Sequence, residues 1–209
     1  QAKRLAQVAS VMGKATSVAA LAAVAGLGLD ELMDSLQTLV DADVMAHAAG
    51  LGVVQFRHAL FQRAAYEALL RRRRTSIHAA YVDWLEDHPE HLMNAQSETL
   101  AYHCEGAGRY DAAAAHYRKA GMTASHAAAN REAAAHFRRA LEAERQAPED
   151  TRNSVRSLEL QVRMAGALLA AEGAGASETE AAYEAAVAMC EATPESDWHF
   201  PAYWGWWRI

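Results

Sequence analysis

Two neighbouring segments of the chain repeat one pattern of small and large apolar residues. The segments are residues 105–121, EGAGRYDAAAAHYRKAG, and residues 126–142, HAAANREAAAHFRRALE. The matching positions are Ala113, Tyr117 and Ala120 in the first segment and Ala133, Phe137 and Ala140 in the second. Spacings of four and three residues place each set on one face of a helix. The pattern recurs after 20 residues, and tandem recurrence on this scale is typical of stacked helical repeats.

The rest of the second half continues this organisation. Pro148 and the glycine-containing segment 173–175 interrupt the helical pattern, because proline and glycine end helices. They separate two further helical stretches, which we expect at residues 151–171 and 177–192. A further repeat is expected to begin within residues 198–209.

Composition supports an all-α fold. Alanine, the residue with the highest intrinsic helix propensity, is abundant in a sequence that is 52% hydrophobic and contains four prolines. Clusters of β-branched residues, which favour strands, are scarce outside Val53 and Val54. We therefore expect helices throughout, with at most one small β-hairpin.

The N-terminal part of the chain predicts three helices followed by a hairpin. The helices are expected at residues 3–12, 17–25 and 30–40. The segments DVMAHAAG (43–50) and LGVVQF (51–56) then fit two short strands. Their turn would lie at Gly50-Leu51-Gly52, since glycine readily adopts the positive φ that tight hairpin turns require. Three helices followed by a two-stranded wing is the element order of a winged-helix domain.

Residues 56–74, FRHALFQRAAYEALLRRRR, predict one long amphipathic helix that ends in four arginines. Its apolar side would carry Phe56, Leu60, Phe61, Ala64, Ala68 and Leu69. Arg63, Glu67 and Arg71 are spaced four apart on the other side, so each arginine can pair with Glu67. The four arginines would lie at the carboxyl end of this helix, where cations complement the helix dipole. Another helix is expected at residues 75–86.

This arginine run suggests a DNA contact, a membrane-surface helix or a structural joint. A DNA-binding winged helix reads bases with its third helix, which here carries Asp30, Glu31 and Asp34 and no lysine or arginine. Carboxylates at that position would repel phosphates, and the formal net charge is −6. No apolar run reaches the roughly 20 residues that span a bilayer. We therefore predict no specific nucleic acid and no membrane as partners, and we interpret Arg71, Arg72, Arg73 and Arg74 as a structural joint.

The sequence predicts no catalytic residue, no cofactor and no metal site. The stretch Gly13-Lys14-Ala15-Thr16 lacks the glycine-rich backbone of a phosphate loop, because Val8 stands where the first glycine is needed. We interpret it as a turn between two helices. The ten histidines include no second pair at a zinc-like spacing, and they are expected to pack or face solvent. Cys104 and Cys190 are expected to be buried thiols, which favours a reducing, cytoplasmic compartment.

Four segments carry a resemblance to a known family: QVASVMGKATSVAALAAVAGL (7–27), FRHALFQRAAYEALLRRRRTSIH (56–78), GRYDAAAAHYRKA (108–120) and FPAYWGWW (200–207). These segments resemble bacterial signalling ATPases of the STAND type. The resemblance is nearest to multidomain proteins in which a class III adenylate/guanylate cyclase domain precedes an AAA-type ATPase and a tetratricopeptide array. The resemblance covers the part that follows the ATPase core. It departs from the ideal tetratricopeptide repeat at Ser97, Ala101 and Cys104, where Trp, Gly and Tyr are typical, and the spacing of 20 is shorter than the usual 34.

The resemblance implies a winged-helix-like domain at residues 1–74, a connecting helix at 75–96 and tetratricopeptide-like repeats at 97–209. It implies a non-catalytic regulatory and interaction region that binds the ATPase core of the same polypeptide and a protein ligand of the repeats. Whether the parent is an ATPase or a cyclase stays open. The alternative is the corresponding region of a MalT-like STAND transcription regulator.

The last residues predict a second interaction site. Both ends of the chain look cut, and Tyr203, Trp204, Trp206 and Trp207 are expected to form the apolar face of a repeat helix whose partner helix follows Ile209. A repeat buries its apolar face only against its neighbours. We therefore expect this segment either to form a homo-oligomer contact or to fold back onto the helix at 177–192.

Overall fold

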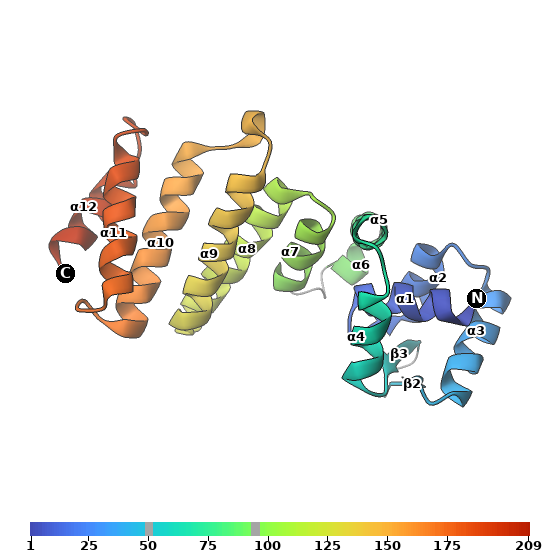
Figure 1. Cartoon of the computed structure of the whole chain (residues 1–209). Coiled ribbons are helices and arrows are strands. Elements are labelled where there is room, and N and C mark those ends of the chain that lie inside the picture. The colour runs from blue at the N-terminus through green and yellow to red at the C-terminus, as the bar shows by residue number, and fades with distance from the viewer. Residues whose placement is uncertain (49–51, 93–96) are drawn as a thin grey trace. The chain divides into compact units, whose positions relative to one another are not determined.

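Helices make up most of the computed structural model, which describes residues 1–48, 52–92 and 97–209, and a small three-stranded sheet completes it. The all-α prediction therefore holds in its coarse form. The chain forms two compact units. Figure 1 shows both units and labels most of their helices and strands. One unit comprises Gln1–Asn94 with Gly106–Gly108, and the other comprises Ala95–Glu105 with Arg109–Ile209.

The N-terminal unit begins with three helices and three short strands. These are α1 (Ala2–Met12), β1 (Ala15–Ser17), α2 (Val18–Ala25), α3 (Leu29–Asp41), β2 (Met45–His47) and β3 (Val53–Phe56). The three helices agree with the sequence prediction to within a residue or two. Gly26 adopts the left-handed conformation after α2 with φ 65°, which glycine accepts without steric cost.

The sheet has the order β1-β3-β2, and both pairs are antiparallel. The predicted hairpin is confirmed in β2 and β3, where Ala46 lies opposite Gln55. Gly52 has the expected positive φ of 74°, whereas Gly50 and Leu51 of the predicted turn lie outside the described residues. The third strand, β1, was not predicted, and the turn expected at Gly13–Thr16 is partly this strand. Three residues are too few to show a period, and their partner lies far along the sequence at β3.

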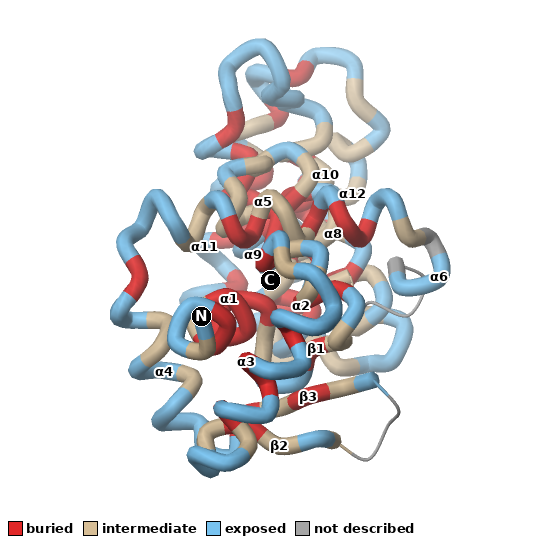
Figure 2. Tube along the Cα trace, turned by 90° about the vertical axis from the view of Figure 1, so that its right-hand side faces the viewer, coloured by how far each residue is buried: buried red, intermediate tan, exposed pale blue. Residues whose placement is uncertain are grey.

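Residues of the helices and of the sheet form the core of this unit. Its fully buried side chains include Leu5, Leu21, Leu32, Leu36, Met45 and Val54. Figure 2 shows the burial concentrated along α1 and β3. The apolar side of α3 is buried at Leu32, Leu36 and Leu39, so the carboxylates of that helix face outward.

The prediction of one long helix at residues 56–74 is wrong. The structure has two helices there, α4 (Ala59–Glu67) and α5 (Arg71–Asp87), separated by Ala68–Leu70. Leu70 is extended, with ψ 146°, and its carbonyl oxygen accepts the backbone N–H of both Arg73 and Arg74. The four arginines therefore begin α5, and they do not end α4. The expected domain boundary at 74/75 falls inside the continuous helix α5, which packs against α1 and α2.

The short helix α6 (Pro89–Leu92) follows α5 in the N-terminal unit. The C-terminal unit then contains six α-helices and one short 3-10 helix among the described residues. They are α7 (Ser97–Gly106), α8 (Tyr110–His126), α9 (Asn130–Gln146), η1 (Glu149–Thr151), α10 (Ser154–Glu172), α11 (Ser177–Cys190) and α12 (His199–Trp207). From α8 onward each α-helix packs against the next, and Figure 1 shows them side by side.

The 20-residue recurrence in the sequence is the step from one helix to its neighbour. Tyr117 of α8 and Phe137 of α9 hold equivalent positions, and both are fully buried. A Cβ atom built on Gly121 would lie 2.6 Å from the Phe137 ring, so the absent side chain lets the ring lie against the α8 backbone. The recurrence thus reflects two helices that bury matching faces against each other.

Candidate interaction surfaces

An exposed row of aromatic side chains covers one face of α12. It consists of Phe200, Tyr203, Trp204 and Trp207, which are 74%, 50%, 48% and 74% exposed. We call these four residues the aromatic stripe. Their spacing of three, four and seven residues from Phe200 places them on one side of a helix. Neighbouring rings stack, with centroids 6.1 Å apart for Phe200 and Trp204 and 5.1 Å apart for Trp204 and Trp207.

The opposite face of α12 is anchored on α10 and α11. Ala202 and Gly205 are buried, and a Cβ atom built on Gly205 would lie 1.9 Å from the Tyr183 ring. Ala202 joins a core cluster with Leu158 and Ala186. Pro201 fits in the first turn of α12 because the amide hydrogen it lacks would have no partner within the helix there. Small residues on this face thus allow close packing and turn the large rings outward.

The structure brings together three of the four predicted aromatic residues. Trp206 lies about 100° around the helix from Trp207 and is half-buried, so it does not belong to the aromatic stripe. Phe200 belongs to it and was not predicted. The spacing of Phe200, Tyr203, Trp204 and Trp207 is the signal that could have found it.

The second predicted site, Arg71–Arg74, lies in the first turn of α5. We call these residues the arginine cluster. Arg74 is held in place, because its Nε donates to the Leu69 carbonyl at 3.0 Å and its guanidinium lies 4.6 Å from the centre of the Tyr66 ring. Arg71, Arg72 and Arg73 are exposed. These three side chains form no ion pair with any residue of segments 1–48, 52–92 and 97–209.

The arginine cluster lies at the amino end of a helix, whereas the sequence predicts it at a carboxyl end, so its interaction with the helix dipole is unfavourable. Cations near a helix N-terminus oppose the dipole and cost roughly 0.3–1 kcal/mol each at an exposed site. The predicted pair of Arg63 and Glu67 does form within α4, at 2.7 Å, whereas Arg71 belongs to a different helix. The arginine cluster therefore does not stabilise the helix that carries it, and its charge remains available to an acidic partner.

Apolar side chains next to this cluster are also exposed. Leu70, 80% exposed, borders a shallow pocket of about 330 Å³ together with Arg72, Arg73 and Ser76. Leu60 of α4 is 76% exposed, and no residue of α4 is fully buried. Figure 2 shows α4 without buried segments. Of the apolar side predicted for residues 56–69, only Phe56 and Leu69 are buried.

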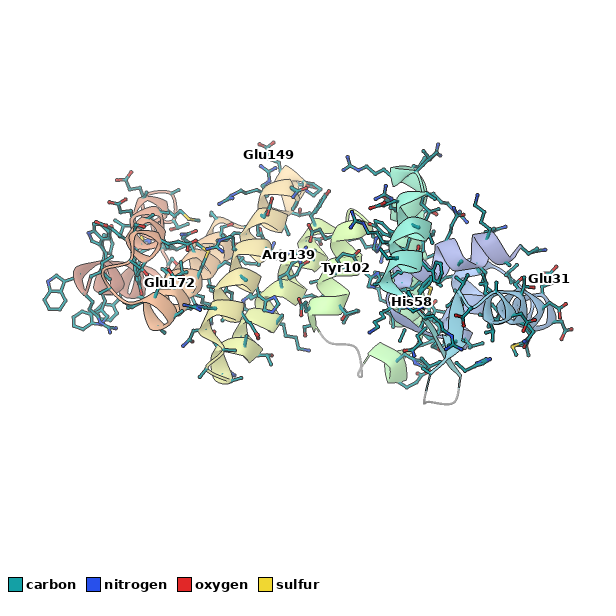
Figure 3. The ribbon with its side chains drawn as sticks, turned by 60° about the horizontal axis from the view of Figure 1, so that its bottom comes forward. Glu31, His58, Tyr102, Arg139, Glu149 and Glu172 are labelled. Atoms are coloured by element: carbon teal, nitrogen blue, oxygen red, sulfur yellow. The ribbon has the colours of Figure 1, made fainter. Side chains whose placement is uncertain are left out.

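The outward face of α3 is acidic. Asp30, Glu31 and Asp34 are exposed, and Figure 3 shows Glu31 at the surface of this helix. The helix carries no basic side chain. A surface of this charge repels the phosphates of a duplex.

Ion pairs join helices two positions apart in the C-terminal unit. Arg139 of α9 contacts Glu105 of α7 at 3.1 Å, and Arg118 of α8 contacts Glu159 of α10 at 2.6 Å. Arg138 of α9 pairs with Glu178 of α11. Figure 3 labels Arg139 within this unit. The same kind of contact thus recurs along the helices.

Two of these pairs belong to larger clusters. The Tyr117 hydroxyl donates to Glu105 at 2.8 Å, and the Arg139 guanidinium lies 4.7 Å from the centre of the Tyr117 ring. Burial, followed by the hydrogen bond to Glu105, raises the pKa of Tyr117. Burial alone would raise the pKa of Glu159, yet hydrogen bonds from Arg118 and Arg163 hold that pKa below its usual value. These charges therefore serve packing between helices.

The histidines and acidic residues of the described segments do not gather into a metal site. No group of three or more His, Cys, Asp or Glu side chains within that part of the chain could hold a metal ion. The His88 ring stacks on Trp84 with the centroids 4.3 Å apart, and the His91 ring lies tilted against Trp84 at 4.8 Å. His78 is buried in α5, and burial followed by the nearby charge of Arg74 lowers its pKa to about 4.

The remaining sequence predictions concern the phosphate loop, the thiols and membranes. Ala15 stands where a phosphate loop has its Ser or Thr, and it lies in strand β1 beside the buried Thr16. Cys104 and Cys190 are buried, and neither forms a disulfide. Within the described residues, no helix combines the length and the hydropathy that crossing a bilayer requires.

Comparison with known proteins shows similarity to a much longer bacterial protein. The chain is 28% identical over 213 residues to an uncharacterized protein of Rhizobium meliloti (strain 1021), covering 99% of this chain. The chain spans about a fifth of the length of that relative, with 20% of it covered. No protein-family profile matches the chain, and no solved structure matches it.

Proposed function

We propose that this chain is a non-catalytic regulatory and protein-interaction region of a multidomain signalling ATPase that is linked to a class III nucleotide cyclase. In this proposal the N-terminal unit is a winged-helix-like domain that binds the ATPase core of the same polypeptide. The C-terminal unit is a tetratricopeptide-like array that binds a protein ligand.

The recurring contacts of the C-terminal unit carry the proposal. Consecutive helices from α8 to α12 pack against each other, and ion pairs join α7 to α9, α8 to α10 and α9 to α11. Such periodic nearest-neighbour packing is characteristic of repeat proteins, in which stacked units present an extended surface to other proteins. This arrangement supports protein binding as the activity of the unit.

The exposed surfaces of the N-terminal unit support a protein partner for it as well. The three free-standing cations of the arginine cluster lie near exposed Leu70, and α4 exposes Leu60 and Phe61. Arginine and aromatic side chains are enriched at protein interfaces, and the buried centre of an interface is apolar. The acidic α3 argues against DNA as the alternative partner.

A binding experiment tests this proposal directly. The 209-residue chain is titrated against the ATPase core taken from the parent polypeptide. Replacing Leu60 with serine or Arg72 with glutamate should weaken binding at least ~10-fold, because each removes an anchor from the contact. Val155→Ser and Arg131→Glu, at exposed positions of the other unit, serve as matched controls and should leave it unchanged.

Two results would contradict the proposal. One is equal binding of the Leu60 and control variants. The other is a parent polypeptide that has no ATPase core, or that carries a DNA-binding domain downstream and no cyclase upstream, which would favour the MalT-like regulators instead.

A further inference from the structure

We propose that the aromatic stripe of α12 is the contact surface of a homodimer, in which the α12 helices of two copies of this chain pack against each other in antiparallel orientation. The proposal goes beyond the function proposed above and does not depend on it.

The exposure of the aromatic stripe is unusual for its composition. Four large rings lie on the outer face of one nine-residue helix, and two of them are 74% exposed. The opposite face is already fixed by Ala202 and Gly205 against α10 and α11. The rings therefore cannot become buried by rotation of α12 without forcing Tyr183 to move. They are therefore available to a partner surface.

Charges at the two ends of α12 indicate what that partner is. Asp197 lies just before the amino end of the helix and Arg208 just after its carboxyl end, and both are exposed. In an antiparallel pair, Asp197 of each copy faces Arg208 of the other. The opposed helix dipoles add to this attraction, since the positive end of one helix lies beside the negative end of the other.

The positions of the charges and rings agree with a single register. The midpoint between Asp197 and Arg208 and the midpoint of the aromatic stripe differ by about one residue, or ~1.5 Å along a helix. One two-fold axis can therefore place both the rings and the charges opposite their equivalents. A contact in which the same patch is used by both copies requires this kind of self-complementarity.

The available area predicts a weak dimer. From the exposed fractions of the four rings and a full value of about 150–250 Å² per aromatic side chain, the aromatic stripe offers roughly 400–600 Å² per copy. Two copies would bury roughly 800–1,200 Å², at the lower limit for specific protein interfaces. We therefore expect association in the micromolar range, on the order of 10–100 µM.

Sedimentation equilibrium across this range of concentrations tests the contact. The unmodified chain should change from monomer to dimer, and Phe200→Ser with Trp207→Ser should raise the dissociation constant at least ~30-fold, since both are large aromatic anchors. Leu29→Ser removes a similarly exposed side chain from α3 and should leave association unchanged. Circular dichroism of each variant checks that the helices are retained.

A charge exchange tests the antiparallel register. Asp197→Lys alone places two cations opposite each other, and Arg208→Glu alone places two carboxylates opposite each other, so each variant should dimerise less than the unmodified chain. An equimolar mixture of the two should associate more strongly than either variant alone, because the mixed dimer restores both attractive pairs. The double variant Asp197→Lys/Arg208→Glu should regain association.

Each other outcome overturns the proposal. A chain that stays monomeric at several hundred micromolar has no such dimer. A dimer that is insensitive to Phe200 and Trp207 uses another surface. A dimer that loses affinity with those substitutions but shows no gain in the mixed charge variants is not antiparallel. Binding of a separate amphipathic helix to the aromatic stripe of a chain that remains monomeric would identify a different occupant.

Discussion

The contact between α8 and α9 makes a testable prediction at Gly121. Replacing Gly121 with alanine adds one methyl group that would lie 2.6–2.9 Å from three atoms of the Phe137 ring. Phe137 is 1% exposed, so the ring has little room to move. Excess volume in a packed core costs about 1–3 kcal/mol.

The control is a second glycine in a helix. Both Gly121 and Gly166 lie inside helices, where a change to alanine improves helix propensity by about 1 kcal/mol. At Gly166 the added methyl would find only the Tyr183 hydroxyl, at an ordinary 3.9 Å. The propensity gain therefore cancels in the comparison. We expect Gly121→Ala to be less stable than Gly166→Ala by about 1–3 kcal/mol.

Urea unfolding followed by circular dichroism measures this difference. Adding Phe137→Leu to Gly121→Ala should recover part of the loss, because leucine is smaller and more flexible than phenylalanine. The combined change should then cost less than the sum of the two single changes, as expected for residues in contact. If Gly121→Ala is as stable as Gly166→Ala, or if the two changes at 121 and 137 simply add, the close approach of α9 to α8 is not as described.

Three further predictions concern nucleotide, DNA and pH. The chain should show no stoichiometric complex with Mg-ATP below about 100 µM in calorimetry, because Ala15 follows Lys14 where a phosphate loop needs Ser or Thr and the glycine-rich loop is absent; a tighter complex would contradict this. Duplex DNA should not bind at roughly 150–200 mM salt, where electrostatic contacts weaken, and sequence-specific binding that persists there in a filter or fluorescence assay would exclude the structural-joint interpretation. The free energy of unfolding should fall by about 2 kcal/mol more between pH 7 and pH 5 in the unmodified chain than in His78→Gln. The sign follows from the low pKa of about 4 for His78 in the fold: below pH 6.5 the unfolded chain takes up a proton that the folded chain does not, so stability is lost as pH falls. Equal pH dependence of the two proteins in urea unfolding would show that the fold does not lower the pKa of His78.

Most helices could be predicted from sequence because their signals are local. The apolar stripe of α3 and the Ala113, Tyr117 and Ala120 pattern of α8 show the helical period directly in the chain. The β2–β3 hairpin could be predicted for a similar reason, since its strands are adjacent and Gly52 meets the need for positive φ.

The sequence shows where the residues of the two candidate surfaces cluster along the chain, but it does not show how they are arranged in space. The sequence indicates that arginines cluster at Arg71–Arg74 and that aromatic residues cluster near the last residues. It does not indicate that the arginines begin a helix or which face of the last helix points outward. Both features depend on contacts with other parts of the unit, such as Gly205 against Tyr183.

What the sequence alone determined, then, is the helical class, the approximate helix positions and the lack of a phosphate-loop pattern, since each depends on residue types a few positions apart. Only the tertiary structure decided the break at Ala68–Leu70, the third strand β1 and the outward face of α12. Alanine and leucine favour a continuous helix at residues 68–70, but the burial of Leu69 and the packing of α4 on α1 and of α5 on α1 and α2 require two helices. Packing between distant segments outweighs local propensity there because propensity differences amount to less than about 1 kcal/mol per residue, whereas burying one leucine contributes about 1.5–3 kcal/mol.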